Sequence, residues 1–203
     1  MMKLLIKQLN IVKGSDTKAA ELFESLLGDF RLIKYNFPHE YVNLYWNKYL
    51  SLNERNANLN GKVFEYIITT LLYNENLLPV YIQAQVAFVP NVDFDALLYS
   101  REVGPIALSM KTSLRERYKQ ADLEAIALKY VHRKAKAFLL TMEENEAVNV
   151  KNKIVSGDII GLDAIVVCSG KDIDEMITNL KNSYQYTIAG SVDIIKSSQV
   201  VNK

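Results

Sequence analysis

One short stretch of the chain, residues 108–124, gathers several side chains that could carry out chemistry. Lys111 ends an apolar run, an Arg-Glu-Arg triplet begins four residues later at Arg115, and Glu124 follows thirteen residues after the lysine. A lysine combined with carboxylates suits metal-assisted hydrolysis of a phosphodiester. Arginine and glutamate side chains have the donors and acceptors that recognise the edges of G·C base pairs. The stretch therefore predicts both a reaction and a reason to bind DNA.

Two further carboxylates, Asp93 and Asp95, flank the first residue of a strand predicted to begin at Phe94. Side chains alternate along a strand, so both carboxylates lie on one face, opposite Phe94. A hairpin turn at residues 101–105 would return the chain as a second strand that ends beside Lys111. Such a hairpin could bring Asp95 and Lys111 together at one edge of a sheet.

Glu124 lies on the helix that is predicted to follow Lys111. A helix in this position packs back across its own sheet, so Glu124 could point to the same place as Asp95. Two carboxylates are enough for Mg²⁺, which also takes water and phosphate oxygens as ligands, and the metal would activate the attacking water. Lys111 would hold that water and offset phosphate charge. The alternative is that Asp93 and Asp95 are turn residues and that Lys111 and Glu124 are surface charges.

The triplet Arg115, Glu116 and Arg117 is predicted to occupy the start of that helix. Ser113 and Glu116 have the spacing of a capping box, with serine at the cap and glutamate three residues later. A helix N-terminus favours nearby phosphates, and its first side chains can enter the major groove. There arginine can pair with guanine O6 and N7, and glutamate with cytosine N4. The alternative is a solvent-facing helix start in which Glu116 serves as the cap.

Hydrophobic periodicity predicts helices around a strand-rich centre. Residues 1–50 read as helical, and residues 53–60 as a polar loop. Strands are predicted at residues 80–89, 94–99, 106–110, 137–141 and 164–168, and further helices at residues 62–73, 113–131 and 172–180. The helix at 113–131 is expected to bury Leu123, Ile126, Ala127 and Tyr130, and residues 143–163 are expected to be irregular.

This order of elements predicts an α/β fold with one mixed central sheet flanked by helices. Residues 1–55 are expected to form a helical N-terminal region, either part of the same domain or an arm for dimerisation or DNA contact. Residues 56–203 are expected to form the core that carries the chemistry.

Composition is that of an ordinary globular protein. The chain has 203 residues, of which 49% are apolar and 23% charged, and a net charge of +1. It has no run of about eighteen apolar residues, so no membrane span is expected. The opening apolar residues are interrupted too soon for a signal peptide. The single cysteine, Cys168, lies in an apolar run and is expected to be buried, which is consistent with a reducing cytoplasm.

Charge is nevertheless uneven along the chain. Residues 101–136 contain nine basic and four acidic residues. A local excess of positive charge of this size suits contact with phosphates. The alternative is a solvated helix face.

The same stretch carries a recognisable pattern, S-x-K-x(12)-E, formed by Ser109, Lys111 and Glu124. With its Arg-Glu-Arg block it resembles the PD-(D/E)XK nuclease superfamily, and within it the EcoRII and SsoII-like branch of type II restriction endonucleases, which read CC…GG sites. In that branch the acidic residue two positions before the lysine is missing, often replaced by serine, and the next helix supplies the carboxylate. The resemblance covers residues 60–140 and does not extend to residues 1–55.

The resemblance implies a restriction-endonuclease-like fold and Mg²⁺-dependent, site-specific cleavage of double-stranded DNA by a homodimer. Asp95 best matches the first catalytic aspartate, with Asp93 the close alternative, and the proline of the superfamily's name directly precedes neither. Asp95 and Glu124 would bind the metal, and Lys111 would position the water. Glu65 looks like a first-helix glutamate often found near the metal in this superfamily. Functional pairing with a cognate DNA methyltransferase is also implied.

In the same branch the Arg-Glu-Arg block reads the G·C pairs of each half-site, a role implied here for Arg115, Glu116 and Arg117. Relatives in this branch stack a flipped central base, and Trp46 is a candidate for that contact. An aromatic residue at helical spacing can equally belong to the core.

Two rival functions stay open. A structure-specific or repair nuclease of the same fold would not need the Arg-Glu-Arg block. A catalytically inactive DNA-binding protein would fit the missing acidic residue at Ser109, although Glu124 at its matching spacing argues against it.

Overall fold

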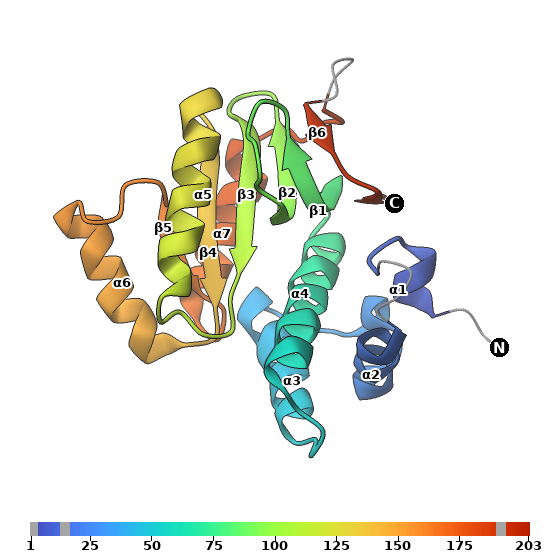
Figure 1. Ribbon diagram of the computed structural model, residues 1–203. Helices are drawn as coiled ribbons and strands as arrows, with labels where there is room; N and C mark the ends of the chain where they lie inside the picture. The colour runs from blue at the N-terminus through green and yellow to red at the C-terminus, as the bar shows by residue number, and fades with distance from the viewer. Residues whose placement is uncertain (1–3, 13–16, 190–193) are drawn as a thin grey trace.

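A mixed β-sheet forms the centre of the molecule (Figure 1). The computed structural model describes residues 4–12, 17–189 and 194–203. The strands are β1 (Val80–Val86), β2 (Phe94–Ser100), β3 (Gly104–Met110), β4 (Lys136–Thr141), β5 (Ala164–Val167), β6 (Ile195–Lys196) and β7 (Gln199–Val201). The predicted α/β fold with one mixed sheet is confirmed, and the five strands expected from the sequence all form.

The sheet combines an antiparallel meander with two parallel additions. Its order is β5-β4-β3-β2-β1-β6, and β7 also pairs with β1. β1, β2 and β3 run antiparallel, whereas β4 and β5 continue the sheet in parallel. Ala96 of β2 lies opposite Leu108 of β3. This register places the start of β2 beside the end of β3, where Asp95 and Lys111 stand.

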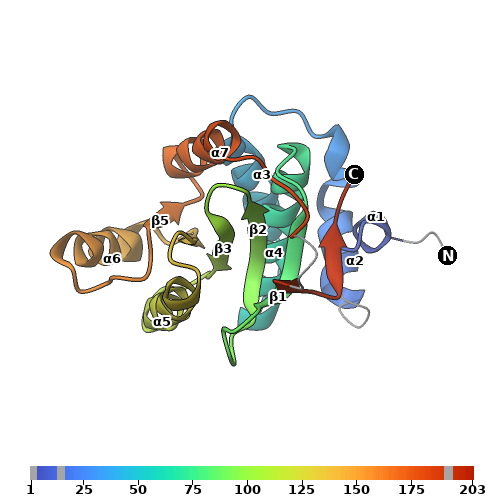
Figure 2. The ribbon, with the colours of Figure 1, turned by 90° about the horizontal axis from the view of Figure 1, so that it is seen from above.

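Helices cover both faces of the sheet (Figure 2). α5 (Arg117–Val131) and α6 (Glu144–Ser156) pack on one face, and α3 (Pro38–Leu50), α4 (Ala57–Asn74) and α7 (Lys171–Ser183) belong to the core on the other. Along β3, Ala107 is buried on the α5 face while Ile106 and Leu108 are buried on the opposite face. Strand alternation therefore supplies each face with its own apolar core.

The N-terminal part of the chain is helical, as predicted, with α1 (Leu5–Gln8), α2 (Thr17–Leu27) and the 3₁₀ turn η1 (Phe30–Leu32) before α3. Phe23 stacks on Tyr45 at a centroid distance of 4.9 Å, and both belong to the apolar cluster that also includes sheet residues. α4 starts within the stretch predicted as a loop, because the Asn56 side chain accepts from the Leu59 N–H and so caps the helix.

Two expectations about the helices are wrong. Residues 144–156 form α6 instead of irregular chain, with Ala147 and Val150 buried. α5 buries Tyr118, Ala121, Ala125 and Leu128, so Leu123 and Tyr130 are 66% and 85% exposed. The alanines fit closely against the sheet, and this places the larger apolar residues outside.

Cys168 is buried, as expected from its apolar surroundings in the sequence. In the part of the chain that the structure describes, no helix combines the length and apolar character needed to cross a membrane.

Candidate active site

An ion pair between two neighbouring strands stands at the centre of the candidate site. Lys111 Nζ lies 2.8 Å from Asp95 Oδ2, and the two side chains are 15% and 14% exposed. The Met110 N–H donates to the same oxygen at 2.8 Å. The Lys111 N–H donates to the Leu140 carbonyl at 3.0 Å, so the backbone at the lysine still pairs with β4. The hairpin thus brings Asp95 to Lys111, as the alternation of the strands predicted.

Glu65 reaches this pair from α4. Its carboxylate lies 3.2 Å from Lys62 Nζ, one turn earlier on the same helix, and its side chain is 18% exposed. Burial raises the pKa of Glu65, and the negative charge of Asp95 raises it further, while Lys62 and Lys111 act in the opposite direction. Glu65 is therefore within electrostatic range of both members of the ion pair.

Glu124 approaches from the other side, on α5. It accepts a hydrogen bond of 2.7 Å from the Gln120 side chain, one turn earlier. Burial raises the pKa of Glu124, the Gln120 hydrogen bond and Lys111 lower it, and the charges of Asp95 and Asp93 raise it. Three carboxylates from a strand and two helices thus interact with the same lysine: Glu65, Asp95 and Glu124.

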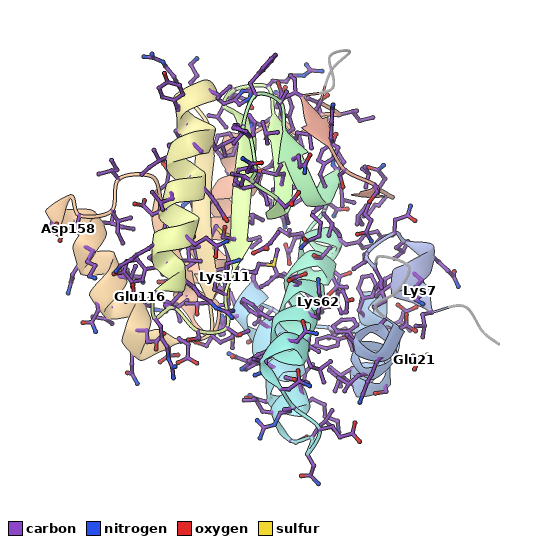
Figure 3. The ribbon with its side chains drawn as sticks, in the orientation of Figure 1. Lys7, Glu21, Lys62, Lys111, Glu116 and Asp158 are labelled. Atoms are coloured by element: carbon purple, nitrogen blue, oxygen red, sulfur yellow. The ribbon has the colours of Figure 1, made fainter. Side chains whose placement is uncertain are left out.

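A cavity of about 330 Å³ opens between α4, the end of β3 and the start of α5. Figure 3 shows Lys111 between α5 and α4, with Lys62 on α4 and Glu116 near the start of α5. The residues that line the cavity are Ala57, Asn58, Gly61, Lys62, Glu65, Met110, Lys111, Thr112 and Arg117. With three cationic side chains and one carboxylate, this lining suits a phosphate group.

A larger cavity, of about 720 Å³, lies beside β5 between α6 and α7. Its lysines are already paired, Lys136 with Asp163 at 3.1 Å and Lys151 with Asp172 at 2.5 Å. In the smaller cavity Lys62 and Lys111 are paired as well, with Glu65 and Asp95, but Arg117 forms no ion pair among the described residues. The smaller cavity therefore keeps a cation for a charged substrate.

The donor set beside Lys111 matches the needs of Mg²⁺. Among the described residues, no three histidine, cysteine, aspartate or glutamate side chains gather closely enough to hold an ion alone. Mg²⁺ does not require three, because it retains several waters and takes one or two carboxylates together with phosphate oxygens. Both hydrogen bonds of Asp95 go to Oδ2, so Oδ1 is without a partner among the described residues. Asp95 therefore has a carboxylate oxygen available to a cation.

The Arg-Glu-Arg triplet lies in the turn that leads into α5. All three side chains are exposed, and neither Arg115 nor Arg117 forms an ion pair among the described residues. Glu116 lies 2.5 Å from Lys119 Nζ, and this hydrogen bond lowers the pKa of Glu116. The predicted capping box does not form, because Glu116 is itself the N-cap residue and makes no side-chain cap.

Asp93 and Trp46 stand apart from the ion pair. Asp93 is exposed just before β2 and accepts a 2.8 Å hydrogen bond from the Gln85 side chain. Trp46 is half-buried on α3, with its ring 5.7 Å from that of Phe64 and 5.5 Å from that of Tyr49. Of the two candidate aspartates, Asp95 is the one that contacts Lys111.

Comparison with known proteins identifies the architecture. A solved structure of the restriction endonuclease PspGI with substrate DNA superposes with a TM-score of 0.50 and 18% sequence identity, covering 89% of this chain and 79% of that one. The chain therefore has a restriction-endonuclease-like fold. No protein-family model and no curated protein matches the sequence.

Within this restriction-endonuclease-like fold, sequence reasoning missed two contributors to the site. Lys62 lines the cavity and pairs with Glu65, and its spacing of three residues from Glu65 on one helix was a usable signal. Glu146 of α6 contacts the turn that carries the triplet. No local pattern links residues that are more than thirty positions apart, so this contact could not be predicted from the sequence.

Proposed function

We propose that this chain is a Mg²⁺-dependent, site-specific endonuclease that cuts both strands of a short palindrome bounded by G·C pairs, of the CC…GG type. The observation that carries the proposal is the half-buried Asp95–Lys111 pair, flanked by Glu65 and Glu124, beside a cationic cavity. The likeness to a restriction endonuclease supports the fold on which this arrangement is built.

The proposed roles follow from the position of each group. Asp95 and Glu124 would hold Mg²⁺, which supplies Lewis-acid activation of water and neutralises phosphate charge. Lys111 would donate a hydrogen bond to the attacking water and contribute positive charge beside the phosphate. Asp95 Oδ2 accepts from Lys111 Nζ and so orients that ammonium group. Glu65, kept near the pair with a raised pKa, would hold or exchange a proton close to the metal ligands.

Base recognition would fall to Arg115, Glu116 and Arg117. Their side chains are exposed at the entrance to α5, and two of them are cations without an ion pair among the described residues. Arginine contacts to guanine and a glutamate contact to cytosine would give discrimination of roughly 1–3 kcal/mol for each bidentate pair. Arg117 also lines the cavity with Lys111, so readout and cleavage would occur side by side.

A two-fold target requires two copies of this arrangement, so the functional form would be a homodimer with one site per strand. A protein that cuts its host's own sequence would also need a cognate methyltransferase to protect that DNA. Trp46 would stack on a flipped base only if its ring left Phe64 and Tyr49.

The direct test is to incubate the purified protein with plasmid DNA and Mg²⁺ and to map the ends. We expect discrete cuts at a CC…GG-type site and no cutting when the metal is chelated. A smear of DNA products, or equal binding to random and CC…GG duplexes, would contradict the proposed site specificity. Preference for branched DNA would favour the structure-specific nuclease instead.

The matching variant is Lys111→Ala. Because Lys111 would act on the water and not on the bases, this variant should lose cleavage by at least about a hundredfold, the scale of one transition-state contact, while specific binding persists. The control is Lys171→Ala, an exposed lysine at the start of α7, which should cut like the wild type. Cleavage by Lys111→Ala would show that the site is assigned wrongly.

A further inference from the structure

The turn that carries Arg115, Glu116 and Arg117 is held by a residue from another helix. The N–H groups of Leu114 and Arg115 both donate to Glu146 Oε2, at 2.6 Å and 3.1 Å. Glu146 belongs to the first turn of α6 and lies more than thirty residues away in sequence. Its carboxylate thus accepts from two N–H groups that the predicted capping box of Ser113 and Glu116 would not have used.

The turn needs such a support, because its backbone is unusual. Arg115 has a φ of 21°, in the positive region that side chains other than glycine rarely adopt. Residues in such conformations persist where their surroundings over-determine them. The Glu146 carboxylate accepts two hydrogen bonds here, one from the N–H of Arg115 itself and one from the N–H of the residue before it.

Leu114 anchors the same turn from the inside. Its side chain is fully buried, and its carbonyl accepts from the N–H groups of Arg117 and Tyr118 at 2.6 Å and 3.2 Å. Its N–H donates a hydrogen bond to the Glu146 carboxylate. The side chain, N–H and carbonyl of Leu114 are therefore all engaged, and the exposed side chains of the triplet follow directly from this anchored residue.

We propose that Glu146 is a positioning residue for base recognition: it sets the backbone from which Arg115, Glu116 and Arg117 reach DNA. This inference rests on the proposed function, since it assumes that the triplet reads bases. Bidentate contacts demand accurate placement, because both hydrogen bonds must form at once. Loss of the Glu146 carboxylate would release the turn and misplace the arginines without removing them.

The test compares Glu146→Ala, Glu146→Gln and wild type in binding to two duplexes without cleavage, with Ca²⁺ in place of Mg²⁺. One duplex contains the CC…GG arrangement that the wild type binds best, and the other differs from it by one G·C pair. The ratio of the two affinities should fall in Glu146→Ala by about five- to 150-fold, the equivalent of one bidentate contact. Glu146→Gln keeps an acceptor oxygen and should restore most of that ratio.

The matched control is Glu144→Ala, in the same first turn of α6, whose carboxylate accepts from the Ser169 hydroxyl at 2.5 Å and does not touch the turn. It should keep the wild-type ratio. If Glu146→Ala fails to fold, as melting would show, the ratio is read from Glu146→Gln and from Glu146→Asp, which shortens the reach of the carboxylate and should lower the ratio.

The possible outcomes distinguish failure of this inference about Glu146 from failure of the proposed function. A wild-type protein that does not discriminate between the duplexes overturns both. A wild type that discriminates, combined with a Glu146→Ala variant that discriminates equally well, overturns the inference alone. Equal weakening of both duplexes by Glu146→Ala would do the same, because a merely structural role lowers affinity without changing the ratio.

Discussion

The carboxylates around Lys111 are held in a state that costs folding energy. Burial raises the pKa of both Glu65 and Glu124, and Asp95 adds repulsion to each. Lys62 and Lys111 offset only part of this for Glu65. Residues chosen for stability alone would not be arranged in this way, since sites that bind cations or catalyse reactions commonly store such repulsion.

Glu65→Gln should therefore stabilise the metal-free protein at neutral pH. The folded-state pKa of Glu65 is raised, so the folded chain binds more protons than the unfolded chain as pH rises above the ordinary glutamate value, and the free energy of unfolding falls through this window. Glu65→Gln has no carboxyl group at this position, so its free energy of unfolding does not fall in this way. We expect a gain of about 1 kcal/mol, typical of stabilising substitutions at active sites, measured by urea unfolding with a chelator at about pH 8.

The gain should shrink as the pH is lowered below about 4, where glutamate becomes protonated in both states. Glu21→Gln, an exposed residue of α2, serves as the control and should leave the unfolding curve unchanged. A Glu65→Gln variant less stable than the wild type at about pH 8 would contradict the argument.

At this scale the sequence predicted the Asp95–Lys111 pair well, because strand alternation and a short hairpin fix which side chains meet. Spacing alone did not distinguish Asp95 from Asp93, because the two lie on the same face of the strand. The structure distinguishes them, since Asp95 contacts Lys111 and Asp93 contacts Gln85. Glu146 could not be predicted, since its partners are backbone groups brought to it only by the tertiary fold.

Helix α4 contributes one whole face to the candidate site, and not only the side chain of Glu65. Residues 57, 58, 61, 62 and 65 all line the small cavity, at the spacing of one side of a helix. One of them, Gly61, lies inside the helix, where glycine costs about 0.5–1 kcal/mol relative to alanine. A Cβ added there would meet no atom within 4 Å. Nothing in the described chain requires this glycine, so the space beside it is available to a ligand.

Gly61→Leu should fold at least as well as the wild type but cut DNA more slowly. Leucine is a strong helix former, so melting should shift upward by the equivalent of about 1 kcal/mol, while its side chain would fill space beside Lys62 and Lys111. Plasmid cleavage under limiting enzyme measures the loss, and Gly61→Ala should lie between the two.

Gly170→Ala is the matched control, because an added Cβ at Gly170 also meets nothing within 4 Å and its φ is negative. It should cut normally. Wild-type cleavage by Gly61→Leu would mean that DNA does not approach this face of α4.

A helix ending at Val131 was predicted correctly, but the face that it buries was not, because packing overrode the amphipathic pattern. α5 turns its alanines to the sheet and leaves Leu123 and Tyr130 in solvent, since small residues allow a helix to lie close to a strand layer. α5 begins at Arg117 and not near Ser113, because Arg115 has a positive φ of 21° that is incompatible with a helix. The strands were easier, because their apolar runs are bounded by turn residues that leave little choice.

Across the whole molecule, positive charge is concentrated in one segment. The net charge is only +1, yet residues 101–136 hold nine basic and four acidic residues. A long-range attraction to DNA would therefore be weak, and the proposed contact would depend on the segment that spans β3, α5 and the start of β4. The described residues contain one Asp95–Lys111 centre per chain, so under the proposed function one chain would attack one strand at a time.

Mixed dimers should nick, not cut, plasmid DNA. If two chains each serve one strand of a symmetric site, a dimer of wild type and Lys111→Ala would keep both sets of recognition residues but only one lysine. Differently tagged chains, co-expressed and purified through both tags, would provide it. Supercoiled plasmid should become open circles with the mixed dimer and linear DNA with the wild type. Linear product from the mixed dimer at the wild-type rate would show that one Lys111 serves both strands, and would rule out a dimer with one site per strand.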